Sequence, residues 1–90
     1  MESELTNYLD QSVVIDTKSQ YIYIGTLASE GKEYLTLKNV DVHDHDDAKV
    51  SKELYIMESA KYGVKTNRKE VKVLKKETIS ISLLENVIIF

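Results

Sequence analysis

The sequence predicts a mainly β protein in which a short N-terminal helix precedes five strands of a strongly bent, antiparallel barrel. Residues 21–42 contain two apolar runs around a polar break, which is typical of a β-hairpin. Gly25 lies inside the first run, where a glycine favours a sharp bend or a close backbone approach. We expect a closed or partly open barrel, since closure removes exposed sheet edges in a chain of 90 residues.

Two short elements are expected before the hairpin. Ser3 is a suitable N-cap, and Leu5, Tyr8 and Leu9 recur at helical spacing, so they predict a short helix with one apolar face. A helix of this length is unstable alone, and we expect its apolar face to lie on the rest of the fold. The β-branched residues 13–15 predict the first strand.

The hairpin itself supplies the second and third strands, over residues 21–28 and 33–42. Both faces of the second strand are apolar, which predicts burial on both sides. In the third strand, the leucines and the valines fall in opposite registers. A β-bulge produces such a change of phase, so we expect one near Lys38 and Asn39.

The second half of the chain is less regular. Residues 43–47 form a charged loop that ends the third strand. Residues 49–69 are compatible with a strand or a helix, and we favour a strand extension. Residues 71–74 and 78–84 predict the last two strands. The apolar residues 86–90 would be an aggregation-prone edge if left free, so we expect them to pair within the barrel or with a neighbouring subunit.

Length and composition indicate a single domain over residues 1–90, with a long variable excursion at about 43–70. The absence of cysteine excludes disulfides, thiol catalysis and Cys-ligated zinc. The first residues are acidic, and no apolar run has the length of a signal peptide or a membrane helix, so we expect a soluble, cytoplasmic protein. The chain has no nucleophile elbow, glycine-rich phosphate loop or HExxH motif, and we expect neither an enzyme nor a bound cofactor.

Charge is distributed unevenly along the chain. Residues 1–47 hold three lysines against ten acidic residues, whereas residues 48–90 hold nine basic against five acidic residues. The net charge of −3 argues against a polyanion-binding surface over the whole molecule. The asymmetry is compatible with one basic face or rim, and equally with two ordinary solvated surfaces.

Two groups of residues resemble the motifs of the Sm-like (LSm/Hfq-type) proteins. The first group is Gly25-Thr26-Leu27 with Leu35-Thr36-Leu37-Lys38-Asn39-Val40, and the second is Leu74-Lys75-Lys76-Glu77-Thr78-Ile79. The resemblance covers roughly residues 3–42 and 71–84. It implies an SH3-type barrel, a homo-oligomeric ring of five to seven subunits, and single-stranded RNA as a partner, with no membrane association.

The chain departs from the family motifs at the positions that hold RNA. The turn is one residue short, so the family's Asn position falls on Tyr34 or Leu35. Lys75 stands in place of an Arg and lacks the planar group that stacks on a base. Lys76 replaces a Gly. The resemblance therefore supports the fold and the ring more strongly than it supports a uridine pocket.

Single-stranded RNA binding is the first functional hypothesis, with Lys32, Tyr34, Lys75 and Lys76 as the predicted site. Tyr34 can stack on a base, as can Tyr21 or Tyr23, and the lysines can contact phosphates around a pore. The alternative is that the tyrosines belong to the core and to subunit interfaces. In that case the protein is an oligomeric structural scaffold or an adaptor ring without RNA binding.

Two further clusters have weaker functional signals. His43 and His45 lie among aspartates and can bind a divalent cation, but they lack a third ligand at a defined spacing, so we predict no metal site. A second basic cluster can contact nucleic acid or protect an exposed segment from aggregation, and we favour the protective role. It contains Lys61, Tyr62, Lys65, Arg68, Lys69 and Lys72.

Overall fold

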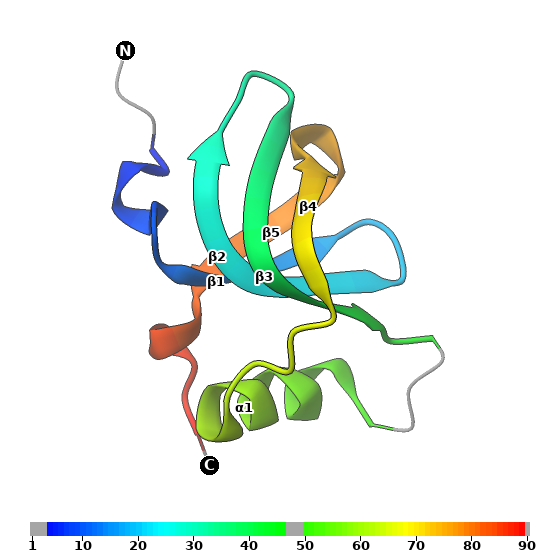
Figure 1. Cartoon of the computed structure of the whole chain (residues 1–90). Helices are drawn as coiled ribbons and strands as arrows, with labels where there is room; N and C mark the ends of the chain where they lie inside the picture. The colour runs from blue at the N-terminus through cyan, green and yellow to red at the C-terminus, as the bar shows by residue number, and fades with distance from the viewer. Residues whose placement is uncertain (1–3, 47–49, 90) are drawn as a thin grey trace.

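Five strands and one α-helix form the protein in the computed structural model, which describes residues 4–46 and 50–89 (Figure 1). Three short 3-10 turns connect or flank them. In chain order the elements are η1 (Thr6–Tyr8), β1 (Ser12–Thr17), β2 (Tyr21–Glu30), β3 (Tyr34–Asp44), α1 (Lys52–Tyr62), β4 (Arg68–Leu74), η2 (Lys75–Glu77), β5 (Thr78–Leu83) and η3 (Leu84–Asn86). The five strands expected from the sequence are therefore present.

The strands form one open antiparallel sheet in the order β4-β3-β2-β1-β5. The predicted closed barrel is wrong, because β4 pairs only with β3 and β5 only with β1 among the described strands. The outer strand β4 carries four charged residues among its seven (Arg68, Lys69, Glu70 and Lys72). Charged side chains on an edge strand oppose further strand pairing, which is consistent with an open sheet.

The predicted N-terminal helix is also wrong, because the described residues there form only the three-residue turn η1. The proposed cap, Ser3, lies outside the described residues. The backbone N–H of Asp10 donates to the carbonyl of Leu27 at 2.7 Å, and the N–H of Leu27 donates to the carbonyl of Gln11 at 3.0 Å. These bonds draw the chain onto β2 directly after the turn. Leu5 and Tyr8 still pack on the core, as expected, whereas the side chain of Leu9 is exposed.

The only α-helix of the described residues lies between β3 and β4, where we favoured a strand. Its N-cap is Ser51, whose side chain accepts a hydrogen bond from the N–H of Leu54 at 3.1 Å. It ends at Gly63, which has a φ of 100°. A serine cap and a glycine at the C-terminus are ordinary helix boundary signals, and they outweigh the weak apolar periodicity between them.

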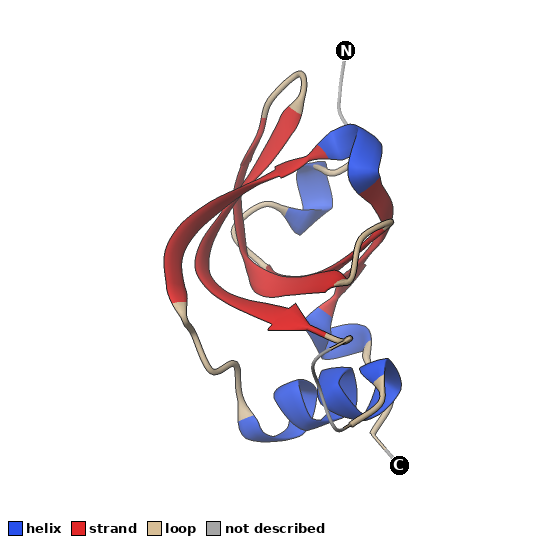
Figure 2. Ribbon diagram, turned by 90° about the vertical axis from the view of Figure 1, so that its right-hand side faces the viewer, coloured by secondary structure: helices blue, strands red, loops and turns tan. Residues whose placement is uncertain are grey.

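Two apolar clusters form the core, one on each side of the curved sheet. The first cluster consists of Val13, Ile15, Leu27, Leu35, Leu37, Val40 and Val73. The second consists of Val14, Ile22, Ile24 and Tyr55 of α1. Figure 2 shows α1 beneath the curved strands, so the helix covers the second cluster. The predicted burial of β2 on both of its sides is confirmed.

The β2–β3 pair bends where Gly25 meets β3. Ile24 pairs with Asp41 but Thr26 pairs with Lys38, so β3 contains an extra residue at this point. Asn39, within the irregularity, has a φ of 53°. The bulge predicted near Lys38 and Asn39 is therefore confirmed. Its bend directs the tip of the hairpin away from α1 (Figure 1).

The described part of the apolar C-terminal tail forms no strand. Val87 packs on the second core cluster, whereas the side chain of Ile88 is 70% exposed. Phe90 lies outside the described residues. No helix among the described residues combines the length and apolar character needed to cross a membrane.

We expect Gly25→Ala to lower the free energy of unfolding by about 1–3 kcal/mol, the usual cost of overpacking. The added methyl carbon would lie 3.0 Å from the carbonyl oxygen of Lys38 and 3.1 Å from Cγ2 of Val40. Urea unfolding measures the change. Gly31→Ala is the control, since its Cβ would meet the Tyr34 carbonyl oxygen at a looser 3.3 Å. Equal destabilisation by the two substitutions would contradict the role of Gly25.

Candidate functional site

The β2–β3 turn and the turn after β4 lie next to each other at the end of the molecule farthest from α1 (Figure 1). Pairing of β3 with β4 ends at Tyr34 and Leu74, and the N–H of Lys75 then donates to the carbonyl of Glu33 at 2.8 Å. This bond holds η2 beside the hairpin turn. Two segments about forty residues apart in the sequence thus form one surface.

A pocket of about 420 Å³ opens between these two turns, and we call it the tip pocket. All four residues of the predicted site line it, together with one acidic and one apolar side chain. The lining residues are Lys32, Glu33, Tyr34, Leu74, Lys75 and Lys76. The volume falls in the range of about 300–1,000 Å³ that small-molecule sites occupy. The structure thus brings together the residues that the sequence singled out, although β3 and β4 are separated by a helix.

Lys75 stabilises the turn that forms the pocket. Its ammonium group lies 2.7 Å from Oε2 of Glu30 and donates to the carbonyl oxygen of Gly31 at 3.2 Å. Both side chains of the ion pair are partly buried, so solvent screens it less than a fully exposed pair. Lys75 therefore contributes to the pocket by positioning the β2–β3 turn, with its charge largely compensated by Glu30.

Lys32, Lys76 and Tyr34 remain accessible at the pocket. Both lysines are exposed, and neither forms an ion pair with any residue in the described ranges. The side chain of Tyr34 is 44% exposed, unlike the fully buried leucine that follows it by three residues. An accessible aromatic ring between unpaired cations can stack on a planar group and contact an anion at the same time.

The other tyrosines named as base-stacking candidates lie elsewhere. Tyr21 pairs with Asp44 at the opposite end of β2, and Tyr23 is partly buried against the first core cluster. The structure therefore does not bring Tyr21 or Tyr23 to the tip pocket. Only Tyr34 combines exposure with a position in that pocket.

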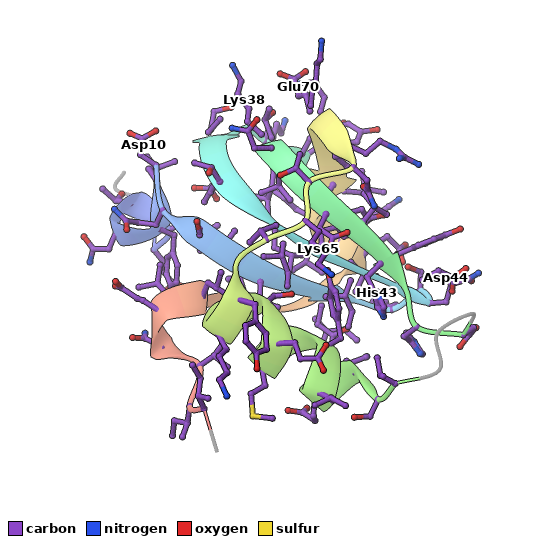
Figure 3. The ribbon with its side chains drawn as sticks, turned by 60° about the horizontal axis from the view of Figure 1, so that its bottom comes forward. Asp10, Lys38, His43, Asp44, Lys65 and Glu70 are labelled. Atoms are coloured by element: carbon purple, nitrogen blue, oxygen red, sulfur yellow. The ribbon has the colours of Figure 1, made fainter. Side chains whose placement is uncertain are left out.

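A polar network around the buried side chain of Asp41 fixes α1 to β3, and no pattern in the sequence predicted it. The hydroxyl of Tyr55 donates to Oδ2 of Asp41 at 2.7 Å, and the side-chain amide of Asn67 donates to Oδ1 at 3.0 Å. Burial first, and then the hydrogen bond to Asp41, raise the pKa of Tyr55. The ring of His43 stacks on that of Tyr55, with centroids 3.7 Å apart, and its Nε2 is buried without a hydrogen-bond partner among the described residues. Figure 3 shows His43 beside the helix.

The histidine and aspartate cluster after β3 does not converge on one point. His43 stacks on α1, whereas the Nδ1 atom of His45 lies 3.4 Å from Oδ1 of Asp46. Within residues 4–46 and 50–89, no group of three or more His, Asp or Glu side chains is placed to hold a metal ion. Asp47, which belonged to the predicted loop, lies outside the described residues.

The second basic cluster is spread over two elements. Lys61 and Tyr62 lie on α1, with the Lys61 ammonium 5.3 Å from the centre of the Tyr62 ring. Arg68, Lys69 and Lys72 lie on the edge strand β4. Lys65 lies in the connection between α1 and β4. The cluster therefore forms no single pocket, and its protective role stays a prediction.

No protein-family model and no curated protein sequence matches this chain.

We expect Tyr55→Phe to lower the free energy of unfolding by about 1–3 kcal/mol at neutral pH, because Asp41 loses a buried donor. The raised pKa means that Tyr55 ionises in the unfolded chain, above about pH 10, before it does so in the folded chain. Its contribution is therefore complete below pH 10 and is lost as the pH rises further. Urea unfolding at pH 7 to 11 should show the difference between the two proteins shrinking.

Tyr62→Phe is the matched control for this substitution. The Tyr62 side chain is 74% exposed and lies on the same helix, so we expect a change within about 0.5 kcal/mol. A Tyr55→Phe penalty that stays constant across the alkaline range would rule out the buried phenol as its source.

Proposed function

We propose that this protein binds single-stranded RNA at the tip pocket, as a non-catalytic module of RNA metabolism in the cytoplasm. The observation that carries the proposal is the meeting of Lys32, Tyr34 and Lys76 at one pocket. These residues were selected from the sequence on chemical grounds and from the resemblance to Sm-like proteins. Their proximity in the fold is an independent fact that supports the selection.

The chemistry of the pocket fits an unpaired nucleotide. Single strands expose their bases, and stacking on an aromatic side chain contributes about 1–3 kcal/mol per base. Tyr34 offers the ring, while Lys32 and Lys76 offer ammonium groups for the adjoining phosphates. The pocket holds three lysines and one glutamate, so its local charge is positive although the chain as a whole is acidic.

We also propose that the protein assembles as a homo-oligomeric ring of five to seven subunits, as the resemblance to Sm-like proteins implies. The open sheet supports this proposal through its edge strand β5, which carries no charged residue, in contrast to β4. On β5, the side chain of Ile79 is 62% exposed. An exposed edge strand with apolar residues favours pairing with another chain. In a closed ring, the edge strand of every subunit would be paired. Because a ring repeats the weak binding site in every subunit, it would also raise the affinity for a long RNA strand.

The Lys32→Gln/Lys76→Gln double variant is expected to weaken binding of oligo-U and to flatten its salt dependence. Each phosphate contact to a single strand contributes about 0.7 to the slope of log K against log salt, so the slope should fall by about 1.4. Fluorescence anisotropy at several salt concentrations measures it. Lys38→Gln removes an exposed lysine of β3 that lines neither turn and serves as the control. An unchanged slope in the double variant would remove these lysines from the site, and no binding by the intact protein would favour a scaffold role.

Ile79→Lys is expected to dissociate the ring, because it adds a charge to the edge of β5. Light scattering should give five to seven times 10.3 kDa for the natural chain and a smaller mass for the variant. Tyr62→Lys adds the same charge at an exposed residue of α1, outside the strands, and should leave the mass unchanged. A monomeric natural chain would overturn the assembly proposal.

A further inference from the structure

A second pocket, of about 430 Å³, lies on the outer face of the sheet beside the tip pocket, and we call it the outer pocket. The two pockets share Lys32, Glu33 and Tyr34. The outer pocket extends from these residues along the sheet to Thr36 and Lys72. Tyr34 therefore borders both pockets.

The pairing register of β3 and β4 places several residues of the outer pocket on one face of the sheet. Tyr34 and Thr36 are two residues apart on β3 and so project from the same face, while Leu35 between them enters the first core cluster. Lys72 of β4 is the direct partner of Thr36. Its ammonium group donates to Oγ1 of Thr36 at 3.1 Å, which holds the lysine across the pocket. Thr36 is only 9% exposed, so its hydroxyl lies at the inner end of the pocket.

The two pockets differ in the polar groups that line them. Three lysines and one glutamate line the tip pocket, which favours an anion. Two lysines and two glutamates line the outer pocket, and one of these, Glu30, already pairs with Lys75. The outer pocket also contains the hydroxyls of Ser29 and Thr36. Hydroxyl groups beside an ammonium group that already donates to Thr36 suit the polar edge of a base or a ribose.

We propose that the outer pocket is a second nucleoside subsite, so that each subunit binds two successive nucleotides, one on each side of Tyr34. This inference rests on the proposed function. The phosphate between the two nucleotides lies at the shared Lys32, and the second nucleoside contacts Thr36 and Lys72. The binding unit of the protein is then a dinucleotide step.

Titration of the intact protein with uridine 5′-monophosphate and with 5′-phosphorylated UpU, followed by NMR, tests this inference. UpU should bind at least about fivefold more tightly, since one extra stacked base contributes about 1 kcal/mol or more. Thr36→Val keeps the β-branched shape and removes the hydroxyl, and it should weaken UpU about fivefold without changing the mononucleotide. Lys72→Met should act in the same direction and replaces the test if Thr36→Val fails to fold.

Thr26→Val is the matched control, because Thr26 is a half-buried residue of β2 that lines neither pocket. It should leave both ligands unaffected. If the natural protein bound the two ligands with equal affinity, the second subsite would be overturned. The proposal of RNA binding at the tip pocket would be unaffected. The inference also fails if UpU binding survives both Thr36→Val and Lys72→Met unchanged. If UpU, the mononucleotide and oligo-U all failed to bind, the proposed function itself would be overturned.

Discussion

The close approach of β2 to β3 at Gly25 is the constraint on which the rest of the structure depends. A side chain at this position would touch the carbonyl of Lys38 and the side chain of Val40. The opposing strand absorbs the bend through Asn39, which adopts a left-handed conformation that asparagine tolerates better than most residues. One half of the hairpin can then cover the first core cluster while the other half packs against α1.

The same bend separates two kinds of polar structure. Near α1, Asp41 accepts a buried hydrogen bond from Tyr55 and a partly buried one from Asn67, and these contacts hold the helix on the sheet. At the far end, Lys32 and Tyr34 are exposed, and neither side chain joins such a network among the described residues. Lys38 and Glu70, labelled in Figure 3, pair in register on β3 and β4 and lie well away from His43 and the helix. Binding at the tip therefore need not disturb the contacts that stabilise the fold.

The strands, the bulge and the bend at Gly25 were predictable because they depend on local sequence. The alternation of apolar and polar residues marks the strands, and its interruptions mark the bulge and the bend. The helix was missed because its two buried residues, Tyr55 and Ser59, are polar enough to hide the usual apolar period. The prediction of a barrel was wrong because closure depends on whether the two outer strands of the sheet pair with each other. No local pattern in the sequence determines that pairing. Similarly, the residues of the tip pocket were found from their chemistry and the resemblance, whereas the pairing of Thr36 with Lys72 follows only from the strand register.

The pairing of β1 with β5 has a consequence for how the chain folds. Val13 is the partner of Leu83, about seventy residues away, whereas β1, β2 and β3 pair with their neighbours in sequence. Contacts between distant segments close large loops and slow the folding rate. The meander of β1, β2 and β3 can thus form early, and β5 completes the sheet late. Until then β1 is a bare edge, so a nascent chain is most vulnerable to aggregation just before its last strands leave the ribosome.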